Sequence, residues 1–332
     1  MKRPALALTL ALLLAGSLSA QTVIKLGSLA PADSPWDKAL LKMALDWQTL
    51  SKGRVTVKVY SGGIAGDEPD MIRKMRIGQL QAAAVSGSGL GKVHPDFLVY
   101  QLPFMARNDE ELEYLFGRLR PRLEKRAEEK GFTFLAFNRS GWLHFFAKTR
   151  VLVPADMEKL KFFVMEGSPE VDQAWKEMGF HIVPLPANDA FAALQSGMVE
   201  VFTASPLSAA ALQWFALAPN MSDFNWSPFT GGLVISSAAW KRIPAELRPE
   251  LARSAEAALD GLSSEVEKVE AQAMQIMKQN GLVVHKITPD QMKQWESLVE
   301  RALRILLDNP ISSDIYREAR GYLEEYRKSH GG

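Results

Sequence analysis

Short runs of β-forming residues alternate with amphipathic helical stretches along most of this chain. The first such unit is a strand at 23–26, a helix that begins at Ser34-Pro35, and a strand at 55–59. Ser34 is a favourable N-cap residue, and Pro35 suits the first helical position. Further strands are expected at 82–85, 133–137, 160–164, 181–184, 199–203 and 233–236, and helices at 68–77, 169–178 and 187–195. This order predicts an α/β fold, in which helices cover a mainly parallel sheet.

The longest helical pattern covers residues 249–280. Its apolar residues recur every three or four positions and form one stripe. At ~1.5 Å per residue such a helix would be ~45 Å long, which is enough to brace two domains. A kink at Gly261 would instead make it an ordinary helix, and the pattern leaves both alternatives open. A capping box at 288–291 predicts one more helix after it.

The N-terminus has the layout of a secretory signal peptide. Lys2 and Arg3 precede an apolar run at 5–14, and small residues follow up to Ala20, where we expect cleavage. An uncleaved membrane anchor is the alternative, but the apolar run is shorter than the roughly 20 residues that span a bilayer. The chain has no cysteine, which excludes disulfides and thiolate metal sites. We therefore expect an exported mature protein.

Several functional classes lack support in this sequence. The net charge of +1 predicts no attraction to nucleic acid or anionic membranes. The glycine-rich segment 87–92 lacks the spacing of a phosphate-binding loop, so we expect a flexible cleft loop whose Ser86 or Ser88 could face a ligand. The five histidines show no zinc-binding spacing, and no G-x-S-x-G elbow is present. We expect no catalytic residue, metal or cofactor.

Four sequence blocks together resemble a known family. They are 61–68 with the helix ending at Gly78, Leu102-Pro103-Phe104, the segment 154–164, and the segment 192–200. Over essentially the whole mature chain, these blocks are similar to the solute-binding proteins of TRAP transporters, the DctP-like family. The resemblance implies a periplasmic receptor with two α/β lobes around a cleft, which hands its solute to membrane permease subunits driven by an ion gradient.

The same resemblance implies a division of the chain. A signal peptide at 1–20 precedes lobe I at 21–137, to which a return segment at about 225–250 also belongs. Lobe II covers 138–224. The remaining ranges are a helix spanning both lobes at 249–280 and a C-terminal segment packing on the lobes at 281–332.

The chain departs from the family pattern where relatives bind a carboxylate. Phe163 stands at the position of an arginine that clamps the acid with two hydrogen bonds, and Leu143 replaces a second arginine. The usual Glu-Asn before a proline is Ala204-Ser205. These departures, with aromatic residues nearby, imply an apolar or amphipathic ligand. The predicted ligand-binding residues are Ser86, Ser88, Trp142, Leu143, Phe163, Phe202, Ser205, Trp214 and Trp226.

Three alternatives remain at this point. The ligand could still be an organic acid, held by Arg139 or Arg150 and by backbone amides. The chain could also be an exported enzyme, or a scaffold whose cleft holds no ligand. Finally, Gly141-Trp142, the turn 66–68 and the missing arginines resemble a branch of the family that works with a periplasmic tetratricopeptide-repeat protein, so such a partner is also an expectation.

Overall fold

A computed structural model describes residues 21–166 and 169–330, so the expected signal peptide at 1–20 lies outside the described residues. The described strands form one sheet with the order β2-β1-β3-β9-β4-β7-β5-β6, and β8 and β10 extend it beside β4. The strands are β1 (Thr22–Ser28), β2 (Val55–Tyr60), β3 (Ala82–Ser86), β4 (Phe132–Ala147), β5 (Lys161–Met165), β6 (His181–Leu185), β7 (Val201–Ala204), β8 (Asn220–Asp223), β9 (Ser227–Ser236) and β10 (Val283–Lys286).

Helices cover both halves of this sheet, as the alternating pattern predicts. They are α2 (Pro35–Leu50), α3 (Glu68–Arg76), α4 (Gly87–Val93), α5 (Asp109–Glu129), α6 (Pro169–Glu177), α7 (Ala190–Ser196), α8 (Pro206–Ala211), α9 (Ser237–Arg242), α10 (Arg248–Gln279), α11 (Pro289–Leu306) and α12 (Ser313–His330). No helix among the described residues has both the length and the apolar character needed to cross a membrane.

Two groups of parallel strands give the molecule two lobes. In the first lobe β1 lies between β2 and β3, and in the second lobe β5 lies between β6 and β7. The long strand β4 belongs to both, because it pairs with β9 as far as Leu143 and with β7 from His144 onwards. The predicted two-lobed α/β fold is therefore confirmed. The predicted strand at 133–137 was too short, because the aromatic stretch that follows it continues the same strand.

The register of β4 shifts where the strand passes between the lobes. The irregularity lies between Arg139 and Trp142, opposite the start of β9. Gly141 sits inside it with a φ of 85°, a backbone conformation that is strained for residues with a Cβ atom. The lobe boundary that we predict at 137/138 falls two residues before this irregularity.

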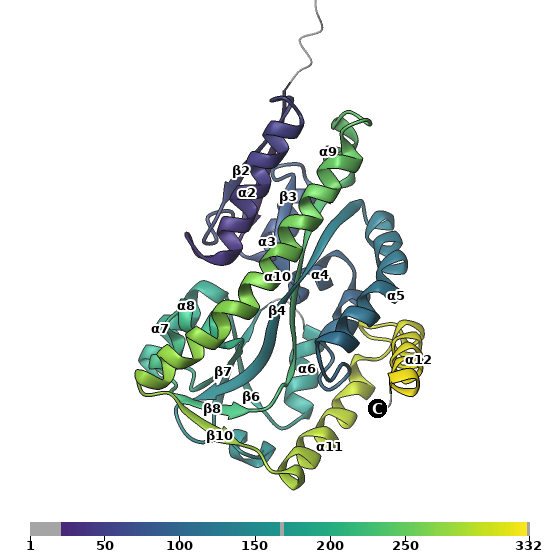
Figure 1. Cartoon of the computed structure of the whole chain (residues 1–332). Helices are drawn as coiled ribbons and strands as arrows, with labels where there is room; N and C mark the ends of the chain where they lie inside the picture. Colours follow the sequence, from purple (N-terminus) through teal and green to yellow (C-terminus); the bar gives the residue numbers. More distant parts are fainter. Residues whose placement is uncertain (1–20, 167–168, 331–332) are drawn as a thin grey trace, which may run out of the picture.

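Helix α10 runs diagonally along the length of the molecule (Figure 1). It is one helix of 32 residues that continues through Gly261. Near its start Leu251 packs in the first-lobe core against β1 and α2, and near its end Met277 packs in the second-lobe core. The spanning helix, rather than the ordinary one, is therefore the correct alternative.

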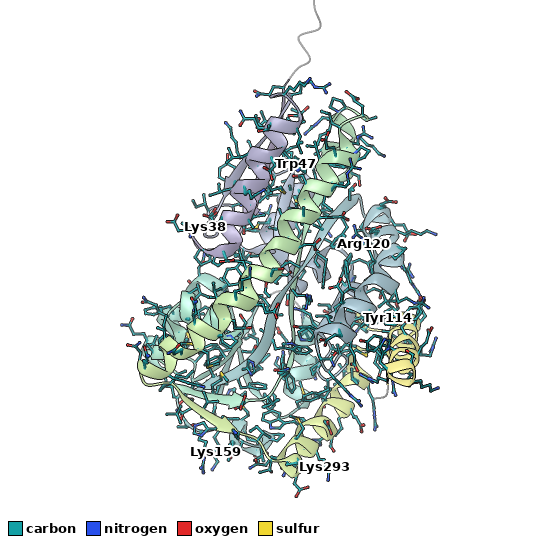
Figure 2. All side chains as sticks on the ribbon, in the orientation of Figure 1. Lys38, Trp47, Tyr114, Arg120, Lys159 and Lys293 are labelled. Atoms are coloured by element: carbon teal, nitrogen blue, oxygen red, sulfur yellow. The ribbon has the colours of Figure 1, made fainter. Side chains whose placement is uncertain are left out.

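Polar contacts join α10 to the first lobe. The indole nitrogen of the buried Trp47 on α2 donates to the carbonyl of Leu251 at 3.0 Å. On the other side Arg120 of α5 forms an ion pair with Glu256 of α10; Figure 2 labels both Trp47 and Arg120. Ser34 caps α2 by accepting from the Asp37 N–H, which confirms the predicted N-cap.

The last two helices attach to different lobes. Helix α11 begins with the predicted capping box of Thr288 and Gln291, and its Trp295 is buried in the core of the second lobe. Helix α12 packs on α5 of the first lobe, where Arg327 pairs with the buried Glu111 at 2.7 Å. The C-terminal segment thus touches both lobes, as β4 and α10 do.

Candidate ligand-binding site

A cavity of about 420 Å³ lies between the lobes, at the carboxyl ends of parallel strands from both of them. Ser28 ends β1, Ser86 ends β3 and Met165 ends β5, while Ser205 follows β7 directly; all four residues line the cavity. Ligands of open α/β sheets bind at this edge, because crevices form where neighbouring connections leave the sheet in opposite directions. The volume is also in the range of small-molecule sites.

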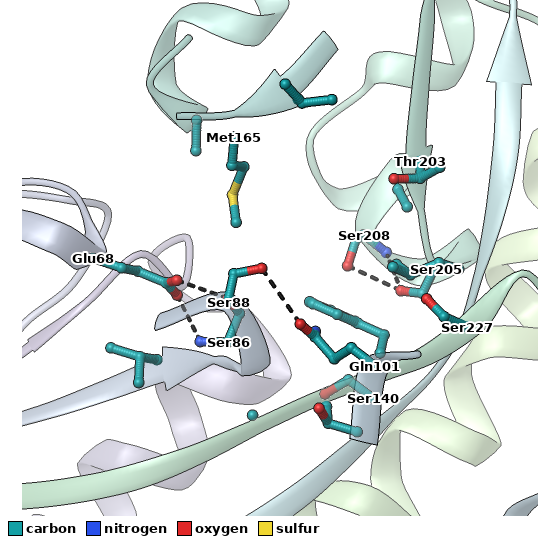
Figure 3. Close-up of a pocket in the computed structure, with 18 of the residues that line it drawn as sticks. Glu68, Ser86, Ser88, Gln101, Ser140, Met165, Thr203, Ser205, Ser208 and Ser227 are labelled. Carbon is teal, nitrogen blue, oxygen red and sulfur yellow. Dashed lines mark hydrogen bonds between the residues drawn. The ribbon is translucent and has the colours of Figure 1, made fainter. Parts of the chain in front are cut away.

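The first lobe supplies a wall of uncharged polar groups. Figure 3 shows Ser86, Ser88 and Gln101 on this side, with the Ser88 hydroxyl 3.5 Å from the side-chain oxygen of Gln101, and Ser140 of the crossing strand β4 beside them. The Asn138 amide donates to the Ser140 hydroxyl at 2.7 Å. Across the cavity the second lobe adds further hydroxyls, those of Thr203, Ser205 and Ser208. Such groups can donate to or accept from an uncharged polar ligand.

A buried carboxylate stands behind this wall. Glu68 is 5% exposed, and it accepts hydrogen bonds from the Ser86 backbone N–H at 2.6 Å and the Ser86 hydroxyl at 2.7 Å. Burial raises the pKa of Glu68, while the hydrogen bonds from Ser86 and Gly89 act in the opposite direction. These N–H groups lie at the start of α4, so the protein itself supplies the acceptor that they need.

The expectation of a flexible loop at 87–92 was wrong, because these residues form helix α4. Ser86 is its N-cap and accepts from the Gly89 N–H. The glycines allow a close approach that larger residues would prevent: a Cβ on Gly87 would lie 2.5 Å from the Gln101 side chain, and one on Gly89 would lie 2.7 Å from the Glu68 carboxylate. Glycine was read as a sign of flexibility where it serves packing.

The second lobe supplies an aromatic wall. Phe163 on β5 is 4% exposed, and its ring meets Trp214 edge-on with ring centres 5.6 Å apart. Phe162 points to the opposite face of the strand, as neighbouring strand residues do, and meets Trp175 edge-on at 4.9 Å. Trp226 stacks on Trp175 at 5.5 Å. All five side chains line the cavity, so its lining reaches both faces of β5.

No arginine, lysine or histidine belongs to the described part of the cavity lining, whereas two acids, Glu68 and Asp172, do. Arg139 points elsewhere and pairs with Asp109 and Glu113 on α5, each at 3.3 Å. Arg150 is also outside the lining.

Lys92 lines a smaller hollow that shares Glu68 and Ser88 with the main cavity. Burial lowers the pKa of Lys92, and the attraction of Glu170 and Asp172 on the other lobe opposes this change. Lys92 thus already faces two acids of the protein, across the gap between the lobes.

Seven of the nine residues predicted to bind the ligand line the cavity, namely Ser86, Ser88, Leu143, Phe163, Ser205, Trp214 and Trp226. Trp142 and Phe202 do not. The indole nitrogen of Trp142 donates to Asp109 at 3.1 Å, and Phe202 is fully buried and stacks on Phe146. Both rings lie in β-strands, and the sequence gives no sign of which face of the strand each ring takes.

Sequence reasoning missed most of the lining, including Gln101 and the inner face of α11. Gln101 follows an apolar stretch without a motif of its own. The inner face of α11, including Leu303 and Leu306, carries the apolar spacing of any packed helix. No signal in the sequence distinguishes these residues from ordinary core residues.

A half-buried acid lies where α10 crosses β4. The carboxylate of Glu270 sits against Gly141, where an added Cβ would be 2.7 Å from Oε1, and this oxygen has no hydrogen-bond partner among the described residues. Burial and the nearby charge of Asp109 raise the pKa of Glu270 to about 7. Glu270 therefore places a carboxyl group with a raised pKa at the crossing of α10 and β4.

Comparison with known proteins agrees with this architecture. Residues 26–307 match the family model described as bacterial extracellular solute-binding protein, family 7. The C4-dicarboxylate-binding periplasmic protein DctP of Rhodobacter capsulatus is 24% identical over 286 residues, which cover 85% of this chain and 86% of that protein.

Solved structures of TRAP periplasmic solute-binding proteins share the fold. One from Ralstonia eutropha, with bound (S)-2-acetolactate, has a TM-score of 0.85 at 19% identity and covers 92% of this chain and 99% of that one. Another from Roseobacter denitrificans, with bound β-D-glucuronate, has a TM-score of 0.84 at 19% identity, with coverage of 90% and 99%. The family consists of solute receptors rather than enzymes. The resemblance to TRAP solute-binding proteins is confirmed, and the chain belongs to the bacterial extracellular solute-binding proteins of family 7.

Proposed function

We propose that this receptor binds an uncharged apolar or amphipathic solute between its lobes and delivers it to the membrane subunits of a TRAP transporter. The observation that carries the proposal is the charge of the cavity wall. Its described lining holds two acids and no basic side chain. The aromatic wall around Phe163 and Trp214 supplies the binding surface, and the hydroxyl-rich wall opposite supplies orientation.

The physical argument concerns the cost of burying a carboxylate. Moving an ionised carboxylate out of water without a cationic partner costs far more free energy than a few neutral hydrogen bonds contribute. A ligand carboxylate in this cavity would also approach Glu68. The oxygens of Glu68 already accept the hydrogen bonds from N–H groups at the start of α4. Burying one apolar side chain contributes about 1.5–3 kcal/mol, so a few aromatic contacts can hold an uncharged ligand.

An organic acid is the second candidate, since related structures hold (S)-2-acetolactate and β-D-glucuronate. It would require Arg139 or Arg150 to act as the clamp. Arg139 is paired with Asp109 and Glu113, so it would have to leave two acids to reach the cavity. Neither arginine lines the cavity, and for this reason we favour the uncharged ligand.

The surroundings of the receptor follow from the same proposal. The protein acts in the periplasm after removal of a signal peptide near Ala20, with permease subunits as its partners. A tetratricopeptide-repeat protein is a further proposed partner; co-purification from the native host under mild conditions tests it, and recovery of the receptor alone would count against it. The proposed lobes are residues 21–137 with 225–250, and 138–224.

Native mass spectrometry of the receptor purified from its host tests the ligand class. We expect a bound neutral, lipid-like mass; a dicarboxylate or sugar acid alone would refute the proposal. As a matched pair, Phe163→Ala should lose the adduct, whereas Phe191→Ala should keep it, because Phe191 is 40% exposed and outside the lining. If neither the melting temperature nor the tryptophan fluorescence responds to any ligand in a broad panel, the chain is a scaffold instead.

A further inference from the structure

The inner face of α11 forms part of the cavity wall. Val299 and Ala302 are buried, Leu303 and Leu306 are half-buried, and all four line the cavity. Leu303 and Leu306 pack against the core clusters of both lobes. The cavity therefore extends from the polar groups between the lobes to the place where the C-terminal segment covers their junction.

The surfaces that face α11 are also apolar. Helix α6 contributes Ala174, and Met178 follows directly after the helix; both belong to the same core cluster as Val299 and Ala302. The first lobe contributes Leu98 and Leu102. We call the space between α6 and α11 the tail arm and define it by Ala174, Met178, Val299, Ala302, Leu303 and Leu306.

Polar side chains are distributed unevenly around the cavity. The hydroxyls of Thr203, Ser205 and Ser208 lie in the segment from β7 to α8, on the Phe163 side of β5. The tail arm lies on the Phe162 side, where Phe162 shares a core cluster with Met178 and Val299. Asp172 is the charged lining residue of α6, and it interacts with Lys92.

We propose that the tail arm is a binding subsite for an unbranched hydrocarbon chain, so that the ligand is an elongated amphiphile with an uncharged head. This inference rests on the proposed function and specifies its substrate class. The head lies among the hydroxyl and amide groups around Ser88, Gln101 and Ser140, and the chain lies between α6 and α11. A compact apolar ligand would leave the tail arm empty, and empty apolar space forfeits the contacts that its walls could make.

Binding affinity should therefore depend on chain length. Each buried methylene contributes about 0.8 kcal/mol, so affinity should rise about fourfold per methylene until the arm is full, and then stop rising. Isothermal titration of the purified receptor with 1-monoacylglycerols of increasing chain length, each below its micelle concentration, measures this dependence. A short organic acid, succinate, is titrated in parallel.

Two variants change the length of the arm in opposite directions. Ala302→Leu adds three carbons to the arm wall, so the affinity should reach its plateau about three methylenes earlier. Leu306→Ala removes three carbons, and the plateau should come about three methylenes later. The control is Arg301→Leu, which changes an exposed position of the same helix and should leave the plateau unchanged. Melting curves identify a variant that does not fold. In that case the plateau of the other arm variant decides whether the tail arm binds the chain.

The outcomes separate this inference from the receptor proposal. Monoacylglycerol binding that is independent of chain length, or a plateau that neither arm variant moves, overturns the tail arm and leaves an uncharged ligand in place. Binding of succinate without any monoacylglycerol overturns both. If the receptor binds neither compound class, the assignment of a neutral amphiphile is wrong.

Discussion

The two walls of the cavity differ in both chemistry and construction. The first-lobe wall is made of short polar side chains at strand and helix ends, such as Ser86 and Ser88, with Glu68 behind them. The second-lobe wall consists mainly of rings that pack on one another, such as Phe163 on Trp214, with a few hydroxyls beside them. Affinity can therefore come from one lobe and orientation from the other, and a substitution should have different consequences on the two sides.

Phe163→Arg should produce the largest effect, since it places a charge in the aromatic wall. Phe163 is 4% exposed and touches Trp214, and an uncompensated charge at such a site costs about 3–5 kcal/mol. Urea unfolding should show this loss, and Phe163→Leu should lose much less because it stays apolar. A Phe163→Arg variant as stable as the wild type would show that this side chain can turn freely into the cavity.

Leu143→Arg should change ligand preference more than stability. Leu143 is half-buried at the cavity, so a new guanidinium there can reach a ligand. A hydrogen-bonded charge pair contributes about 1.5–3 kcal/mol, so the affinity for succinate should rise at least tenfold. Titration of this variant beside Leu143→Met checks the gain. Equal affinities in the two variants would mean that other groups set the charge preference of the cavity.

Protonation of Glu270, which lies where α10 crosses β4, should have a smaller effect on the free energy of unfolding. The pKa of Glu270 is raised to about 7, so the folded state favours its neutral form. Its contribution to stability is therefore complete below pH 4.5 and declines as the pH rises through about 7. Since the side chain is partly exposed, the change should be on the order of 1 kcal/mol.

Denaturant unfolding at a series of pH values between 4 and 8 measures this contribution. The curve of Glu270→Gln should lack the decline, and its difference from the wild type should grow towards pH 8. Glu267→Gln, an exposed position one turn earlier on α10, is the matched control and should follow the wild type. Parallel curves for all three proteins would assign the pH dependence to other groups.

Ser88→Ala should have the smallest effect, and it tests the polar wall alone. Ser88 is exposed, and its long contact to Gln101 adds little to the fold, so the free energy of unfolding should change by less than about 0.5 kcal/mol. Losing one neutral hydrogen bond to the ligand head should weaken binding about fivefold. If binding instead falls as much as in Phe163→Ala, the division of roles between the walls is wrong.

The sequence predicts the fold better than the site, for reasons that particular residues show. Periodicity and caps place α2, α10 and α11, because Ser34 and Thr288 cap helices through local contacts. The direction of Phe202 depends on partners distant in the sequence, since β7 is buried on both faces. Helix α4 was missed because its glycines are explained by Gln101 and Glu68, which local patterns do not connect with it.

The length of α10 has a consequence for how this protein can vary. Helical residues advance by about 100° each, so inserting one residue near Gly261 would rotate everything beyond it by that angle. Leu251 and Met277, which now enter the cores of different lobes, could then no longer both face inward. The number of residues between these anchors is thus fixed by geometry, while insertions and deletions should accumulate in surface connections such as the one between α9 and α10.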